Sequence, residues 1–342
     1  MQTVLNSIIV EKVKDSKINK VDFNNLSFGK YFTDHMMVCD YRNGAWEVPK
    51  IVPYQPITLD PSAKIFHYGQ SVFEGMKAYK DKDQNVWLFR PLENQKRINI
   101  SSKRLAMPEF PEDYFMEDHK WIPTAEGSSL YIRPFVFASG CGFHASPSDE
   151  YKFIIACSPS ASYFAGKVKV LIEEKYSRSA NGGVGFAKAG GNYAGQFYPT
   201  QLAVEKGYNQ VIWTDDNNHE YIEEAGAMNI FVRINDTLIT SPTSDRKSII
   251  EIAKDENIAV EVRKITVKEV VEASKNGSLK EMFGAGTAAV ISPIATFGYQ
   301  EKDYDLPELK DSYASILKKR ITDIQYNKAE DKFGWRYKVD IE

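Results

Sequence analysis

The stretch SRSANGGVGFAKAGGNYAG, residues 177–195, has the most unusual composition in the chain. Glycine and alanine crowd around one lysine, Lys188, just before a helical pattern at 193–206. Small residues let a ligand approach the backbone, and a lysine amine that has lost water can act as a nucleophile or Schiff-base partner. A flexible surface loop with a solvated lysine would have the same composition, so both interpretations stay open.

Two more turns rich in small residues follow. In IEEAGAMNIF, residues 222–231, Glu223 and Glu224 stand before such a turn. Successive side chains of a strand point to opposite faces, so one of these two carboxylates would point inward and would need a cationic partner. The alternative interpretation is that both glutamates are exposed turn residues. In FGAGTAA, residues 283–289, backbone N–H groups and one hydroxyl form a pattern that often holds an anion.

Composition excludes several classes of protein. The 342 residues are 43% hydrophobic and 26% charged, which is ordinary for a folded protein of about two domains. Lys and Arg number 43 against 46 Asp and Glu, without a long basic stripe, so we expect no nucleic-acid partner. The apolar runs are too short to span a membrane and the N-terminus carries charges, which favours a cytoplasmic protein. The cysteines Cys39, Cys141 and Cys157 show no paired spacing, and we expect them to be buried. The histidines show no metal-ligand spacing.

Secondary-structure patterns predict two domains. We expect a smaller α+β domain at 1–162, a linker at 163–169 and a larger domain at 170–342. Apolar and β-branched runs predict strands at 50–57, 86–90, 130–138, 151–157, 168–173, 209–213, 228–233, 237–240 and 258–266. Apolar periodicity, with Pro91 at one start, predicts helices at 91–107, 193–206, 246–254 and 268–276.

Several motifs together resemble one family. They are FGKYFTDHM at 28–36, HYGQSVFEGMKAY at 67–79, SLYIRPFVF at 129–137, FAKAGGNYAG at 186–195, IEEAGAMNIF at 222–231 and FGAGTAAVISPI at 283–294. In this order they resemble the branched-chain amino-acid aminotransferases, which are fold-type IV pyridoxal-phosphate enzymes. The resemblance implies an α/β fold with α+β character and pyridoxal 5'-phosphate at the junction of two domains. It also implies reversible amino transfer from leucine, isoleucine or valine to 2-oxoglutarate by a homodimer.

The resemblance also implies which residues bind the cofactor. Lys188 matches the lysine that holds it as a Schiff base and moves the proton. Tyr193 matches the tyrosine on its phenolic oxygen, and Glu224 the carboxylate on its pyridine nitrogen. Arg97 and Thr287 match phosphate-binding residues, and the planar fork of an arginine suits that task.

Substrate-binding residues are implied in the same way. Tyr131 and Arg133 match residues that receive the distal carboxylate of glutamate. The others match aromatic walls of the pocket, or turns whose backbone N–H groups receive the α-carboxylate: Phe28, Tyr68, Phe73, Ala227 and Ala288. In the implied homodimer, Tyr68 and the loop 140–144 of one subunit edge the pocket of the other.

The chain is shorter than the family pattern at two places. A phosphate-binding turn after Asp245 is shorter by some seven residues, and a segment around 111–121 is also short. The first shortening would weaken cofactor binding. Two alternatives therefore stay open: another fold-type IV enzyme, such as a D-amino-acid transaminase or an aminodeoxychorismate lyase, and a non-catalytic homologue. Tyr131 and Arg133 argue against the first alternative.

Overall fold

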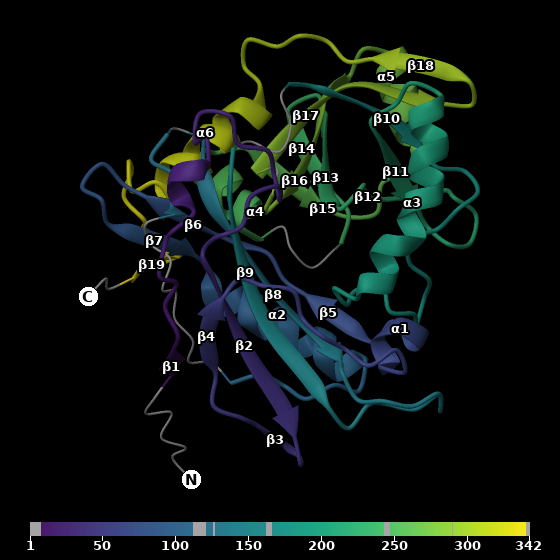
Figure 1. Cartoon of the computed structure of the whole chain (residues 1–342). Helices are drawn as coiled ribbons and strands as arrows, with labels where there is room; N and C mark the ends of the chain where they lie inside the picture. The colour runs from purple at the N-terminus through teal and green to yellow at the C-terminus, as the bar shows by residue number, and fades with distance from the viewer. Residues whose placement is uncertain are drawn as a thin grey trace. The chain divides into compact units, whose positions relative to one another are not determined.

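The computed structural model describes residues 8–111, 121–125, 127–161, 166–242, 247–288 and 290–339 (Figure 1). Backbone contacts divide the chain into two compact units. The first unit is Met1–Tyr163 with Ala187–Gly191 and Gln325–Glu342, and the second is Phe164–Phe186 with Asn192–Ile324. The sequence predicts that all of 170–342 lies in the second domain. Ala187–Gly191 and Gln325–Glu342 instead belong to the first unit, because their backbone contacts lie there.

The first unit is built on a ten-stranded sheet with two α-helices and one 3-10 turn in its described part. Its elements are β1 (Ile9–Val10), η1 (Ile18–Lys20), β2 (His35–Arg42), β3 (Ala45–Trp46), β4 (Lys50–Pro53), α1 (Lys64–Tyr68), β5 (Ser71–Phe73), β6 (Met76–Lys80), β7 (Val86–Phe89), α2 (Pro91–Arg104), β8 (Ser129–Ala138), β9 (Tyr151–Ser160) and β19 (Arg336–Val339).

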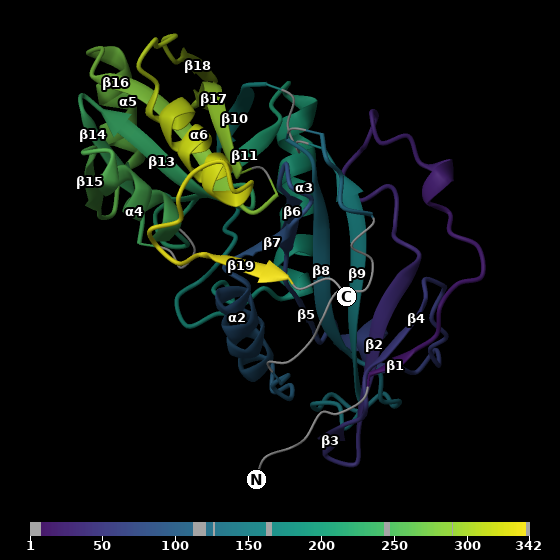
Figure 2. The ribbon, with the colours of Figure 1, turned by 90° about the vertical axis from the view of Figure 1, so that its left-hand side faces the viewer.

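Antiparallel pairing dominates this sheet. The strand order is β1-β4-β2-β9-β8-β6-β7-β19, and of the described pairings only β1 with β4 is parallel. Strands β8 and β9 pair over ten residues each and lie side by side in Figure 2. Strand β19 pairs with β7, which explains why the C-terminus belongs to this unit.

A buried carboxylate fixes the turn between β6 and β7. Asp81, 5% exposed, accepts hydrogen bonds from Trp87 Nε1 and Asn327 Nδ2, both at 2.9 Å. It also accepts from the backbone and side chain of Asn85, at 2.9 and 3.1 Å. Burial alone would raise the pKa of the Asp81 carboxyl, but these hydrogen bonds lower it to about 2. Because Asn327 lies near the C-terminus, the carboxylate joins distant parts of the chain.

Asp81→Asn should destabilise the first unit. An amide nitrogen would face the donors on Trp87 and Asn327, and losing hydrogen bonds to a charged acceptor costs about 1.5–3 kcal/mol. The folded pKa lies below the ordinary 3.8, so this stability is present above that value and is lost as the pH falls toward 2. In urea unfolding, the free energy of unfolding of Asp81→Asn should lie below that of the parent, and this difference should become smaller in acid. Asp83→Asn, at an exposed neighbouring position, is the control. A difference between Asp81→Asn and the parent that does not change with pH would contradict the assignment.

The second unit contains a nine-stranded mixed sheet. Its elements are β10 (Val168–Ile172), α3 (Gly190–Glu205), β11 (Gln210–Thr214), β12 (Ile222–Ala225), β13 (Met228–Ile234), β14 (Thr237–Thr240), α4 (Lys247–Asp255), β15 (Ala259–Val262), α5 (Val267–Lys275), β16 (Leu279–Gly286), β17 (Val290–Tyr299), β18 (Lys302–Asp305) and α6 (Tyr313–Gln325). The order is β12-β11-β10-β17-β16-β13-β14-β15, with parallel pairs at β10–β11, β10–β17 and β14–β15. Valine and isoleucine dominate its core.

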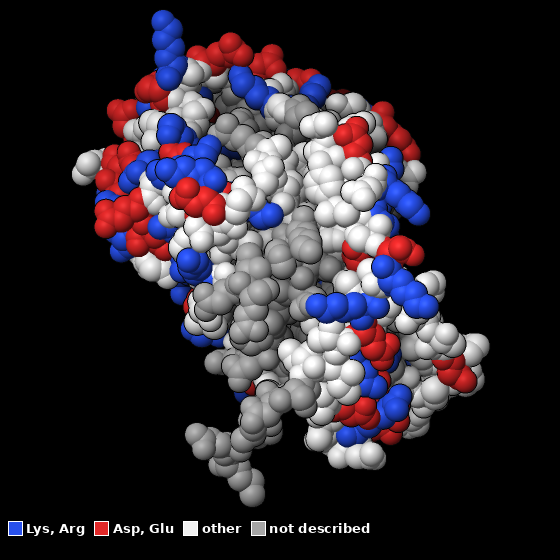
Figure 3. Space-filling view, turned by 60° about the vertical axis from the view of Figure 1, so that its left-hand side comes forward, with Lys and Arg blue, Asp and Glu red and all other residues white. Residues whose placement is uncertain are grey.

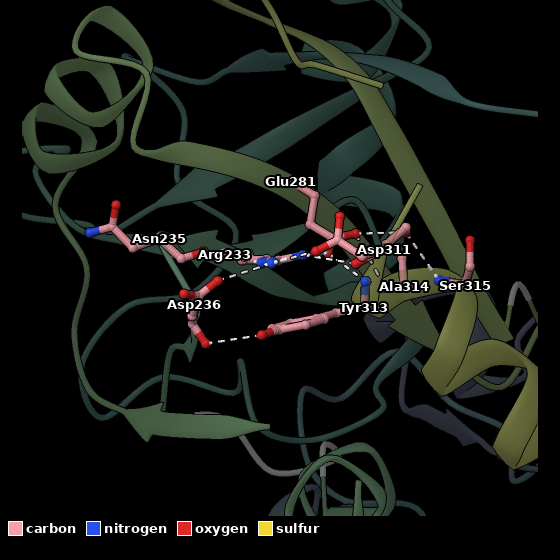
Figure 4. Close-up of polar contacts among 9 residues, drawn as sticks. Arg233, Asn235, Asp236, Glu281, Asp311, Tyr313, Ala314 and Ser315 are labelled. Atoms are coloured by element: carbon pink, nitrogen blue, oxygen red, sulfur yellow. Dashed lines mark hydrogen bonds and ion pairs between the residues drawn. The ribbon is translucent and has the colours of Figure 1, made fainter. Parts of the chain in front are cut away.

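A buried ion network ties this sheet to α6 (Figure 4). Arg233 on β13 donates to Glu281 Oε1 at 3.4 Å and to the Asp311 carbonyl at 2.9 Å, and its guanidinium lies 3.7 Å from the ring centroid of Tyr313. Glu281 accepts from the backbone N–H groups of Tyr313, at 2.6 Å, and Ala314, at 3.2 Å. A carboxylate at a helix N-terminus is stabilised by the unpaired N–H groups there. The network therefore fixes where α6 begins.

The mixed topology confirms the predicted α/β fold with α+β character, and helices and strands form at all the predicted places, with ends shifted by a few residues. One expectation was wrong: Cys39 and Cys157 are buried, but Cys141 is exposed, because it lies in a loop. On the face seen in Figure 3, basic and acidic side chains are interspersed. Within the described ranges, no helix is long and apolar enough to cross a membrane.

Candidate active site

The backbone of Lys188 is held on both sides in the first unit. Its N–H donates to Ser101 Oγ at 3.0 Å, and its carbonyl accepts from the N–H of Phe73 at 3.0 Å. The next residue, Ala189, forms an antiparallel bridge with Val72. The lysine therefore lies along β5, which excludes the alternative of a loose surface loop. Its Nζ is 5.0 Å from the ring centroid of Phe73.

Arg97 projects from α2 against a carboxylate that has no exposed surface. The Arg97 Nε donates to Glu74 Oε1, and its Nη2 donates to Glu74 Oε2 at 2.8 Å. Glu74 also accepts from its neighbour Gly75 N–H at 3.0 Å and from Asn94 Nδ2 at 2.9 Å. A two-point contact of this kind fixes the plane of a guanidinium. The sequence reasoning missed Glu74, although a lone acidic residue within the strand-like motif SVFEGMKAY was a usable signal.

An aromatic cluster surrounds Arg133 on β8. Its guanidinium lies 4.7 Å from the ring centroid of Phe73 and 5.1 Å from that of Tyr131, and its Nη2 donates to Tyr131 Oη at 3.0 Å. Phe28 contacts Tyr131 edge-on at 4.8 Å. A Cβ on Gly75 would lie 2.0 Å from Tyr131 Oη, so glycine is needed for the tyrosine to reach this place. Four predicted site residues thus meet in one cluster.

The Nε atom of Arg133 is buried and has no hydrogen-bond partner in the described structure. A buried unpaired donor costs about 1–3 kcal/mol. The Tyr131 hydroxyl accepts from Arg133, so its own proton is available for another acceptor. The arrangement therefore favours a ligand with a carboxylate at this place.

Tyr68 is directed to a different part of the first unit. It ends α1, is 42% exposed, and its hydroxyl donates to the carbonyl of Phe143. Lys64 on the same helix donates to the carbonyls of Ser146, at 3.2 Å, and Pro147, at 3.1 Å. Helix α1 therefore fixes the loop that contains Phe143, and Tyr68 does not join the cluster around Arg133.

In the second unit, the predicted inward carboxylate does have a cationic partner. Glu224 on β12 forms an ion pair with Arg178 at 3.1 Å, with both side chains largely buried. Its neighbour Glu223 accepts from Ser179 Oγ at 3.1 Å, and burial raises the pKa of the Glu223 carboxyl. Sequence reasoning did not single out Arg178, although this arginine lies in the glycine-rich stretch 177–195.

Two hairpin turns of the second unit carry other predicted site residues. Ala227 follows Gly226, whose φ of +59° suits a tight turn between β12 and β13. Thr287 and Ala288 follow β16. The turns are neighbours, since a Cβ built on Gly286 would lie 3.8 Å from the carbonyl oxygen of Ala227. Thr287 and Ala227 are exposed, so a ligand can reach both residues.

Strain marks the second of these turns. Val290, which begins β17, has a φ of +61°, where a β-branched residue is rarely found. Two residues later, Ser292 Oγ is buried without a hydrogen-bond partner among the described residues. Such features gather at functional sites more often than elsewhere. Tyr193 lies on α3 and is half buried.

Comparison with known proteins gives consistent matches. The sequence model of amino-transferase class IV matches residues 71–297. The branched-chain-amino-acid aminotransferase 2 of Bacillus subtilis is 42% identical over 348 aligned residues, which cover 96% of each chain. The branched-chain aminotransferase of Thermoproteus uzoniensis, solved with norvaline, has a TM-score of 0.71 at 22% identity and covers 89% of this chain and 99% of its own. That of Thermobaculum terrenum, solved in its PLP form, has a TM-score of 0.69 at 17% identity, with 90% and 99% covered.

Fold and family model together define a class IV aminotransferase. With 42% identity over nearly its whole length, the chain belongs to the branched-chain aminotransferase family within that class. The Bacillus alignment is longer than the 342 residues of this chain, so it contains gaps here. The shortenings predicted near 111–121 and after Asp245 fall largely on residues 112–120 and 243–246, which lie outside the described residues.

Proposed function

We propose that the protein transfers the amino group of leucine, isoleucine or valine reversibly to 2-oxoglutarate, with pyridoxal 5'-phosphate held covalently on Lys188. The observation that carries the proposal is the Lys188 segment, which is bound at both backbone groups and has its amine 5.0 Å from the ring centroid of Phe73, the ring that the Arg133 guanidinium also contacts. The relatives named above, one solved with norvaline and one in its PLP form, support the substrate class and the cofactor.

The residues present fit this cofactor. An amine, a guanidinium, a carboxylate and hydroxyl groups are the donor set for its aldehyde, phosphate, ring nitrogen and oxygen. When bound, the cofactor supplies an electron-withdrawing ring that stabilises negative charge at the substrate α-carbon. Lys188 Nζ would move the proton at that carbon, and Arg97 and Thr287 would bind the phosphate. Glu224, oriented by Arg178, would accept a hydrogen bond from the ring nitrogen, and Tyr193 would donate to the phenolic oxygen.

One pocket must accept both apolar and acidic substrates. The rings of Phe28, Phe73 and Tyr131 offer an apolar wall for a branched side chain. The same cluster contains the buried Arg133 Nε–H and the Tyr131 hydroxyl, which can donate to the distal carboxylate of glutamate. Backbone N–H groups of the turns at Ala227 and Ala288 would receive the α-carboxylate.

An absorbance spectrum tests the proposal. Purified protein supplied with pyridoxal phosphate should develop a visible band, and leucine should convert it to the band of the aminated cofactor. Adding 2-oxoglutarate should restore the first band and release glutamate. A spectrum of free cofactor only, with no change on adding leucine, would support the non-catalytic alternative.

We also propose that the protein acts as a homodimer in the cytoplasm, with amino acids and 2-oxo acids as its small-molecule partners. Exposed aromatic residues near α1, namely Phe66, Tyr68 and Phe143, offer apolar surface that a second copy can cover. Sedimentation at working concentration should show twice the mass of 38.8 kDa. A fully active monomer would rule the dimer out.

A further inference from the structure

One buried hydroxyl connects the segment of Lys188 with the helix of Arg97. Ser101 on α2 has no exposed surface. Its Oγ accepts from the N–H of Lys188 at 3.0 Å and donates to the carbonyl of Arg97 at 2.9 Å. A serine hydroxyl has one proton to donate and lone pairs to accept, so both bonds exist at once.

The hydroxyl is not explained by helix stability. A serine that bonds back to the carbonyl four residues earlier slightly weakens and bends a helix, and alanine is the better helix former. Alanine would lose both contacts, but inside α2 the Arg97 carbonyl still has the helical N–H of residue 101, whereas the Lys188 N–H would lose its acceptor. A role in the position of that lysine is therefore the simplest reason for a hydroxyl here.

The other end of the connection is also fixed. The Arg97 guanidinium is held in its plane by Glu74. Asn94, on the same helix, donates to Glu74 Oε2 at 2.9 Å and to the carbonyl of Gly75 at 3.2 Å. Helix α2 is thereby fixed to the segment that follows β5, and Phe73 at the end of β5 donates to the carbonyl of Lys188. Ser101 closes this ring of contacts.

We infer that Ser101 is a positioning residue, which sets the separation between the amine that holds the cofactor and the guanidinium that binds its phosphate. The inference rests on the proposed function. The aldehyde and phosphate of pyridoxal phosphate are joined by a rigid ring, so both anchors can be satisfied only at one separation. A misplacement of about 1 Å can cost a factor of about 100 when two groups must engage together.

Ser101→Ala tests this inference, with Ser102→Ala as the matched control. Ser102 neighbours it on α2 and is buried to 1% exposure, so the same atom is removed from the same helix. Hydrogen exchange of the cofactor-free proteins should show faster exchange at the Lys188 amide in Ser101→Ala only. The dissociation constant for pyridoxal phosphate should rise about tenfold, which corresponds to one lost hydrogen bond, and should not change in Ser102→Ala.

Rescue separates positioning from packing. Ser101→Thr keeps an oxygen at the same position and should retain most of the affinity. If Ser101→Ala does not fold, Ser101→Cys, with a weaker donor and acceptor, should still show the loss. Unchanged affinity in a folded Ala or Cys variant, beside a parent that binds the cofactor, would overturn the inference alone. A parent that forms no visible band would overturn the proposed function and this inference with it.

Discussion

Replacing Lys188 by alanine should abolish transamination and leave the fold intact. The amine is the group that would bond to the cofactor and move the proton at the substrate α-carbon, and no other residue of the 187–191 segment carries one. The contacts that hold the segment come from its backbone, so they survive the substitution. We expect turnover to fall to background, while the far-ultraviolet circular dichroism and unfolding midpoint stay near those of the parent.

Covalent labelling identifies the lysine directly. Borohydride reduction of the parent with pyridoxal phosphate, followed by peptide mapping, should place the label on the peptide that contains Lys188. Lys96→Ala, an exposed lysine on α2, serves as the control and should keep both label and turnover. A label on another lysine, or turnover that survives in Lys188→Ala, would refute the assignment.

Local patterns predicted much of the secondary structure. Pro91 marked the start of α2, and apolar and β-branched runs marked β8, β9 and β13. The strand β19 was missed, because its sequence RYKV carries no strong signal and its pairing with β7 joins residues far apart in the chain. The long strands β2 and β16 were also missed. Charged Asp40 interrupts the apolar run of β2, and the small residues at the end of β16 are more typical of a turn.

The candidate site was predictable by residue type but not by geometry. Motifs pointed to Lys188, Arg97 and Glu224, since each carries a chemical group that the family resemblance requires. Their partners Ser101, Glu74 and Arg178 are ordinary residues in sequence, and only tertiary contacts reveal them. A carboxylate as buried as Glu74 needs a cation, but the sequence does not show which cation it meets.

Arg133→Ala should slow the half-reaction with glutamate far more than that with leucine. The buried Nε–H that would donate to the distal carboxylate disappears, while the rings of Phe28, Phe73 and Tyr131 that would contact leucine remain. Losing a charge-assisted hydrogen bond costs about 1.5–3 kcal/mol, or about ten- to a hundredfold in rate. The Arg133 guanidinium also donates to the Tyr131 hydroxyl, so its removal takes away the contact that orients this second donor. We therefore expect the loss in glutamate rate to be nearer a hundredfold than tenfold.

Single-turnover spectra measure each half-reaction separately in the same protein. Leucine is the internal control for folding and cofactor loading, because both substrates use the same Lys188. Arg133→Lys is the informative second variant, because lysine keeps the charge but lacks the planar fork of arginine. Its rate with glutamate should lie between that of Arg133→Ala and that of the parent. If Arg133→Ala loses rate equally with glutamate and leucine, Arg133 supports the pocket as a whole, and Tyr131→Phe should then also lose both rates equally. If Arg133→Ala and Tyr131→Phe each lose rate mainly with glutamate, both side chains donate to its distal carboxylate.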